Sequence, residues 1–286
     1  ETVLVMTNLM KFTVTLSLIF SINHVYADRE AFESTYVPLA PEKIVIQNAS
    51  IYDGDGGEFF ETDVLVEDGK IIAIGKDLPF SNEFRVIDAT GKWVTPGIID
   101  IHSHMGVYPA PGVRTSSDGN EATSPVTADV WAEHSIWVQD PQYALALTGG
   151  VTAFHILPGS ANLIGGRGVT VKNLQRVTIN SMKFPDAPHS LKMACGENPK
   201  RVYGNRGQAP STRMGNAAGY RKSWIQAEGY LRRLNEYEEK SDEAKELEYA
   251  PTRDLEMETL AGVLKGEILV HNHCYRADEM AVSYTH

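Results

Sequence analysis

The feature that most constrains this chain is an apolar stretch that rises from a Pro-Gly turn and ends in two histidines. Residues 94–104 read Val-Thr-Pro-Gly-Ile-Ile-Asp-Ile-His-Ser-His. Side chains alternate between the faces of a strand, so His102 and His104 project from the same face, with Asp100 one step deeper. Leaving the two imidazoles unpartnered at the end of a buried strand would cost desolvation free energy. The spacing therefore favours metal binding over two surface histidines.

A second pair of histidines has the same spacing near the C-terminus. Residues 270–274 read Val-His-Asn-His-Cys, so His271 and His273 also share one face of an expected strand end. Packing alone does not readily explain two such pairs at separate strand ends. Imidazole-rich sites favour zinc, although the sequence does not decide between one metal ion and two.

The first histidine motif resembles the first barrel strand of the amidohydrolase superfamily. That strand reads roughly Pro-Gly, two apolar residues, Asp-x-His-x-His. Residues 48–54 and 66–75 are similar to the small β-sandwich that precedes such barrels. Residues 149–152 and 192–201 are similar to the imidazolonepropionase-like branch of the superfamily. The resemblance runs from about Lys43 to the C-terminus. It implies a (β/α)8-type barrel with a small N-terminal β-sandwich, and a metal-dependent hydrolase.

Strand spacing divides the chain into three parts. Residues 1–27 are interpreted as upstream readthrough plus a signal peptide, 28–96 as part of the β-sandwich, and 97–286 as a partial β/α barrel. Short strands are expected at 44–47, 63–67, 70–74 and 85–88, because Asp-Gly and Gly-Lys turns separate them. From Gly97 onward the strands lie farther apart, as in parallel β/α units. They are expected at 98–104, 151–157, 191–197 and 268–273, with a further one including 168–172.

The barrel is expected to be incomplete. A complete one needs about 250 residues, and only about five of its eight strands fit after Gly97. The chain is therefore interpreted as a C-terminally truncated enzyme whose open sheet edges favour aggregation. The resemblance implies a catalytic Asp from the eighth strand, which would lie beyond His286.

The resemblance also implies a bridging metal ligand from the fourth-strand region, either a carbamylated lysine or a glutamate. Lys192 and Glu197 are five residues apart, so a regular strand directs them to opposite faces. We expect Glu197, at the strand end, to be the ligand, and Lys192, near the strand start, is the alternative. A loop carboxylate is the other interpretation of Glu197. An Arg-Ala-Asp sequence follows the second histidine pair. Aligning this sequence with the superfamily pattern makes His273 the metal ligand from the fifth strand. His271 then lies deeper in the barrel or binds substrate.

Three further groups of residues have weaker interpretations. Arg201 and Arg206 belong to a basic, Gly-rich segment over 198–221 that either holds a substrate carboxylate or is a solvated loop. His155 lies inside an expected strand and is interpreted as a hydrogen-bonded core histidine. Residues 158–168 are rich in glycine and belong at the active face, but they lack the strand-then-helix setting of a phosphate loop.

Charge and the N-terminus indicate the compartment and the partners. The net charge of −11 excludes nucleic acid as a partner, because no basic stripe is present. Met10-Lys11, an apolar run and a small residue at Ala27 are typical of a secretory signal, and the run is too short for a membrane anchor. A periplasmic or secreted location follows. Cys195 and Cys274 are expected to be packed thiols, because one would point into the barrel and the other out.

The predicted activity is hydrolysis of a C–N bond in an amide, cyclic amide or dipeptide by metal-activated water. A divalent metal held by His102, His104, Glu197 and His273 would lower the pKa of its bound water. A metal-dependent deaminase or esterase of the same fold is one alternative, and a catalytically inactive metal-binding fragment is another. The partner is a small-molecule substrate, and a homo-oligomer is compatible with the sequence.

Overall fold

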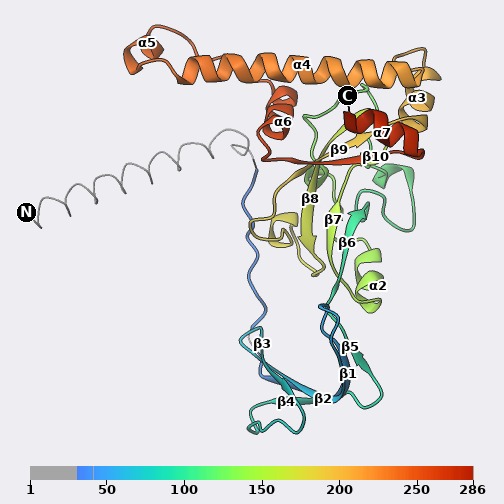
Figure 1. Ribbon diagram of the computed structural model, residues 1–286, viewed down its shortest axis with the longest axis vertical. Coiled ribbons are helices and arrows are strands. Elements are labelled where there is room, and N and C mark those ends of the chain that lie inside the picture. The colour runs from blue at the N-terminus through green and yellow to red at the C-terminus, as the bar shows by residue number, and fades with distance from the viewer. Residues whose placement is uncertain (1–30, 41, 286) are drawn as a thin grey trace, which may run out of the picture.

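The computed structural model describes residues 31–40 and 42–285, which form two separate sheets and a set of helices (Figure 1). The expected signal peptide lies outside the described residues. No helix within the described part is both long enough and apolar enough to cross a bilayer. Residues 31–36 run along the second sheet, where the Ser34 hydroxyl donates to the Lys183 carbonyl oxygen and the Lys183 ammonium donates to that of Phe32.

The N-terminal sheet has five strands. They are β1 (Ile44–Tyr52), β2 (Glu58–Glu67), β3 (Lys70–Gly75), β4 (Arg85–Asp88) and β5 (Trp93–Val94), in the order β3-β2-β1-β4 with β5 also on β1. β1, β2 and β3 are antiparallel, whereas β4 and β5 run parallel to β1. A small core of Ala49, Ile51, Val64 and Ala89 lies beneath them. The expected sandwich is thus seen as one mixed sheet in the described residues.

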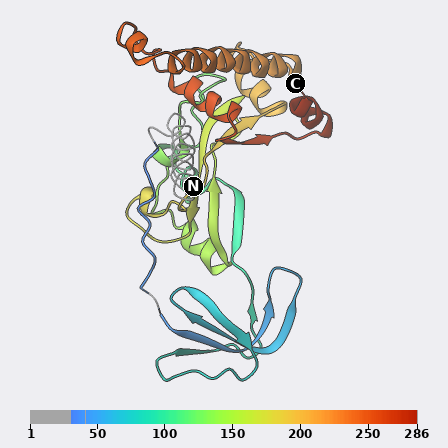
Figure 2. The same cartoon turned by 60° about the vertical axis from the view of Figure 1, so that its left-hand side comes forward.

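The second sheet curls into half a barrel (Figure 2). Its strands are β6 (Ile98–Ser103), β7 (Val151–Ile156), β8 (Ile164–Lys172), β9 (Ser190–Ala194) and β10 (Leu269–His273), in the order β10-β9-β8-β7-β6. The pairs β6–β7 and β9–β10 are parallel, as expected. β8 is antiparallel to both of its neighbours, so the all-parallel expectation is wrong there. The loop from β7 to β8 is too short for the crossover that a parallel pair requires.

Helices connect the strands of this half-barrel, and some of them pack on its apolar face. They are α2 (Gln142–Thr148), α3 (Glu197–Gly204), α4 (Arg213–Glu238), α5 (Asp242–Glu246), α6 (Leu255–Leu264) and α7 (Ala277–Thr285). Short 3-10 turns occur at Arg114–Ser116, Ala132–His134 and Ile179–Ser181. Thr212 and Asp254 cap α4 and α6 by accepting the backbone N–H groups of Gly215 and Met257. These caps fix the first turns of the two helices.

Alternation along the strands separates a packed face from a polar face. Leu191 and Met193 of β9 pack with Leu260 of α6 in one apolar cluster. Phe154 and Ile156 of β7 pack in a second cluster that includes Tyr143 of α2. The residues between them in sequence, His155 on β7 and Lys192 on β9, therefore point to the opposite face. That face carries the candidate site.

Candidate metal and substrate site

His102 and His104 lie at the C-terminal end of β6, as the sequence predicts. Their ring centroids are 5.3 Å apart. His104 Nδ1 lies 2.8 Å from the Leu157 carbonyl oxygen at the end of the neighbouring β7. A carbonyl oxygen only accepts hydrogen bonds, so Nδ1 carries the proton and Nε2 keeps its lone pair. The backbone of β7 thus sets the tautomer in which His104 can bind a metal ion.

Lys192 lies beside the first histidine pair. Its side chain is buried, with 1% of the residue exposed. The Nζ atom lies 3.2 Å from His102 Nε2 and donates to the Pro158 carbonyl oxygen at 3.0 Å. Burial lowers the pKa of Lys192 to about 8. The expectation that Lys192 lies far from the site is wrong, because β9 is short and the long side chain spans the distance from mid-strand to its end.

Glu197 lies beyond the end of β9, on a helix. β9 ends at Ala194, and Gly196 follows with a φ of +71°, a left-handed conformation that turns the chain into α3. Glu197 is the first residue of that helix and is exposed. Its charge is favourable in the first turn of a helix. The expected strand over 191–197 is therefore three residues too long, and the expected placement of Glu197 at the strand end is wrong.

His271 and His273 lie on β10, directly beside β9. The parallel register pairs His271 with Lys192 and His273 with Ala194. His271 stacks on His155, with ring centroids 4.6 Å apart, and is the deeper of the two. His155 Nε2 lies 2.5 Å from the Ser190 hydroxyl and its Nδ1 2.9 Å from that of Thr170. The interpretation of His155 as a hydrogen-bonded core histidine is confirmed.

Burial favours the neutral form of all four histidines, because it lowers the pKa of each. Burial first, and then the charges of Lys192, of His104 and of the β10 pair, lower the pKa of His102 to about 4. Burial and the charge of Lys192 also lower the pKa values of His271 and His273. Neutral imidazole is the form that ligates metals.

The histidines do not by themselves form a metal site in the described part of the chain. Among the described residues, no three His, Cys, Asp or Glu side chains are close enough together to hold an ion by themselves. The Lys192 amine, 3.2 Å from His102 Nε2, is the further nitrogen group that lies beside the histidines. Nitrogen donors of this type suit zinc.

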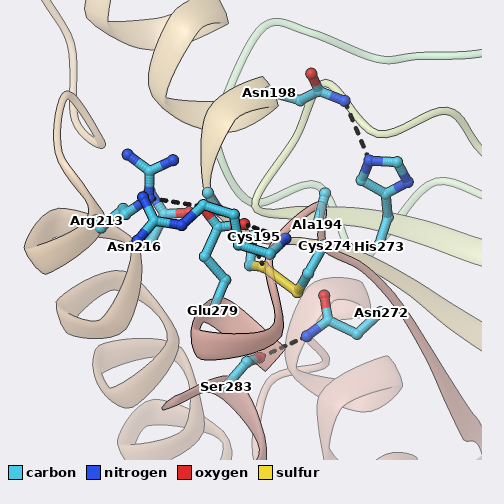
Figure 3. The surroundings of a disulfide bond; sticks show 12 residues. Ala194, Cys195, Asn198, Arg213, Asn216, Asn272, His273, Cys274, Glu279 and Ser283 are labelled. Carbon is cyan, nitrogen blue, oxygen red and sulfur yellow. Dashed lines mark hydrogen bonds and ion pairs between the residues drawn. A yellow bond between two sulfur atoms is a disulfide. The ribbon is translucent and has the colours of Figure 1, made fainter. Parts of the chain in front are cut away.

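Cys195 and Cys274 form a disulfide at the ends of β9 and β10, with Cα atoms 5.1 Å apart (Figure 3). The expectation of two packed thiols is therefore wrong. It assumed that Cys195 shares the inward face with Glu197. Because Lys192 is the inward residue of β9, Cys195, three positions later, lies on the opposite face, where Cys274 also lies.

Sequence reasoning missed a group of neutral polar side chains around His273. The Asn198 amide nitrogen donates to the Ser160 hydroxyl at 2.8 Å and lies 3.4 Å from the Tyr275 hydroxyl. The Tyr275 ring stands edge-on to His273. On the other side of the site, the Tyr108 ring stands edge-on to His104. The one available sequence signal was that Ser160 and Asn198 each follow an expected barrel strand, where active-site loops lie.

Of the two arginines expected to bind substrate, one lies on α3 and the other in the segment that follows it. Arg201 is exposed on α3. Arg206 is exposed as well, and its guanidinium donates to the Ala122 carbonyl oxygen and lies over the Tyr203 ring. A substrate role for these residues therefore stays a prediction.

Comparison with known proteins places the chain in a superfamily. No family model matches it. An amidohydrolase, tasK of Hapsidospora irregularis, is 36% identical over 251 residues, which are 82% of this chain and 25% of that protein. A dihydroorotase of Lactobacillus helveticus is 46% identical over 74 residues, 26% of this chain and 16% of that protein.

A solved structure agrees with these relatives. An amidohydrolase from Thermotoga maritima superposes with a TM-score of 0.76 and 38% identity, covering 85% of this chain and 61% of that one. The chain belongs to the amidohydrolase superfamily. It spans about a quarter of the length of tasK and less than two thirds of the Thermotoga protein.

Proposed function

We propose that this chain carries the metal-binding half of an amidohydrolase that cleaves a C–N bond with metal-activated water. The observation that carries the proposal is the position of Lys192. Its amine lies 3.2 Å from His102 Nε2, and its backbone pairs in register with that of His271 on β10. Relatives named amidohydrolase and dihydroorotase support the reaction class. An amide, a cyclic amide or a dipeptide is the substrate class proposed.

We assign the bridging ligand to Lys192 as its carbamate, in place of Glu197. An uncharged amine adds to carbon dioxide through Nζ and releases a proton, which leaves a carboxylate on the nitrogen. The modified side chain would supply the oxygen ligands that this cluster of histidines lacks. The Pro158 carbonyl oxygen accepts from Nζ and so fixes the side chain toward His102.

The remaining residues of the site orient the metal ligands. A divalent ion, proposed to be zinc, would lower the pKa of its bound water and polarise the substrate carbonyl. His102, His104 and His273 are the histidine ligands proposed here. The Leu157 carbonyl oxygen holds the His104 tautomer. His155 packs under His271 and fixes its ring.

A secreted or periplasmic location is part of the proposal. The signal-like segment over residues 10–27 supports it. The Cys195–Cys274 disulfide also supports it, because structural disulfides persist in oxidising compartments. The proposed partner is a small-molecule substrate.

Elemental analysis of the purified chain, prepared with zinc and bicarbonate, tests the metal site. We expect about one to two equivalents of zinc, lost in both His102→Ala and Lys192→Ala. Glu197→Ala is the matched variant, and it should keep its zinc because Glu197 is an exposed residue at the start of α3. Incorporation of 13C-bicarbonate, followed by 13C NMR, should give a carbamate signal that Lys192→Ala removes.

Other outcomes would each contradict a stated part of the proposal. Zinc lost in Glu197→Ala and kept in Lys192→Ala would return the bridging role to Glu197. A folded wild-type chain without zinc would refute the metal site. Zinc binding without turnover of any amide, cyclic amide or dipeptide, in a longer form of the protein as well, would instead favour a non-catalytic metal-binding protein.

A further inference from the structure

Asn198 is a buried amide whose nitrogen makes one short and two long hydrogen bonds. It is the second residue of α3, with 9% of the residue exposed. One contact of its Nδ2 atom is short, the 2.8 Å bond to the Ser160 hydroxyl. The other two are long, 3.4 Å to the Tyr275 hydroxyl and 3.5 Å to His273 Nε2. Figure 3 shows the amide directed at the His273 ring.

The long contacts leave one N–H of the amide available. Hydrogen bonds of this type are normally 2.7–3.2 Å long, and they weaken beyond that range. If His273 binds a metal ion through Nε2, that atom no longer accepts from Asn198. The second N–H of Asn198 would then face whatever oxygen lies beside His273. A buried donor of this kind gains free energy by finding an acceptor.

The loop after β7 fixes this amide relative to the metal ligands. The Pro158 carbonyl oxygen accepts from Lys192, and two residues later the Ser160 hydroxyl accepts from Asn198. The start of α3 is held as well, because the Gly196 N–H donates to the side-chain oxygen of Asn216. One short loop therefore sets the separation between the Asn198 amide and the Lys192 amine.

We propose that Asn198 is a catalytic residue whose Nδ2 donates to the substrate carbonyl oxygen, where negative charge develops during attack by water. The inference rests on the proposed function. Fixed donors aimed at developing charge in a site of low polarity contribute strongly to catalysis. Asn198, Ser160 and Tyr275 are uncharged, so the group recognised beside His273 is a neutral amide carbonyl. A free carboxylate finds no charged partner among these three side chains.

Kinetics on a longer form of the protein, and inhibitor binding on the zinc-loaded chain, test the inference. Asn198→Ala and the isosteric Asn198→Asp both remove the donor, and Lys200→Ala, an exposed change on the same helix, is the matched control. With a neutral amide substrate, we expect kcat to fall about 10²-fold in both Asn198 variants. KM and zinc content should change little, and Lys200→Ala should match the wild type.

A second measurement does not depend on turnover. Acetohydroxamate places an oxygen anion on a bound metal ion, and its Kd can be measured by calorimetry. We expect a Kd about tenfold weaker in the Asn198 variants, the size of effect for one hydrogen bond to a charged acceptor. Thermal unfolding of each variant separates this loss from a loss of fold. The Asp variant preserves the shape of the side chain if the Ala variant does not fold.

The outcomes separate this inference from the proposed function. Unchanged kcat and unchanged hydroxamate affinity in the variants would overturn the role of Asn198 while zinc binding stands. Loss of zinc together with activity would also overturn it, because Asn198 would then only hold His273. If the wild type binds zinc without turnover, then the hydroxamate affinities decide. If the wild type binds no zinc, the proposed function fails and the inference fails with it.

Discussion

Removing the Cys195–Cys274 disulfide should destabilise the protein by an amount set by the length of chain it closes. The two cysteines are 79 residues apart in sequence. The loop-closure relation for a ring of that size gives about 15 cal/mol/K, or about 4.5 kcal/mol at 25 °C. The bond joins the ends of two parallel strands whose residues already pair in register. We therefore expect its effect to lie mainly in the unfolded chain.

The assay is urea unfolding followed by circular dichroism, for the oxidised chain, the reduced chain and the Cys195→Ala/Cys274→Ala double variant. The free energy of unfolding should fall by up to about 4.5 kcal/mol in the last two. A reducing agent should leave the double variant unchanged, which controls for effects of the reagent. A loss below about 1 kcal/mol with an unchanged urea slope would refute the reasoning, because the loop would then not be constraining the unfolded state.

Two further predictions concern buried charges. The Lys183 ammonium lies 2.8 Å from the Glu133 carboxylate, whose side chain is 2% exposed. Lys183→Met should therefore lower the urea-measured free energy of unfolding by about 3–5 kcal/mol, and adding Glu133→Gln should restore much of it. Burial, and then the charges of Asp129 and Asp254, raise the pKa of Glu256 to about 7. Stability should therefore fall as pH rises from about 4.5 to 7, because the unfolded chain loses this proton first, and Glu256→Gln should flatten that part of the profile.

The histidine positions could be predicted from sequence because strand alternation is a local property. His102 with His104, and His271 with His273, each share a face that follows from two-residue spacing alone. The residue at which a strand ends depends more on contacts with distant parts of the chain. β9 stops at Ala194 because its residue pairing with β10 ends there and the left-handed Gly196 redirects the chain.

That one boundary accounts for two wrong expectations. Extending β9 to residue 197 gave Glu197 an inward position and removed Lys192 from the site. The same extension gave Cys195 the wrong face and so excluded the disulfide. Asn198 was missed for a related reason, because its position depends on where α3 begins and on contacts with Ser160 and Tyr275, which are distant in sequence.

The sequence pattern could not predict the direction of β8 either. Residues 168–172 were recognised as a strand, but alternation is the same in either direction. Only its pairing with β7 and β9 shows that it runs antiparallel to both. The described N-terminal strands form a single sheet and not the expected sandwich, and this too depends on which strands pair with one another.

The disulfide also makes a closed covalent ring of the chain between β9 and β10. The long helix α4 projects from the half-barrel within that ring, with α5 at its far end (Figure 1). Tyr249, just beyond α5, is fully exposed and accessible to a protease. A single cut there opens the ring without separating the pieces, since Cys195 and Cys274 remain bonded. The strand that carries His273 would thus stay tethered to the strand that carries Lys192 in a nicked molecule.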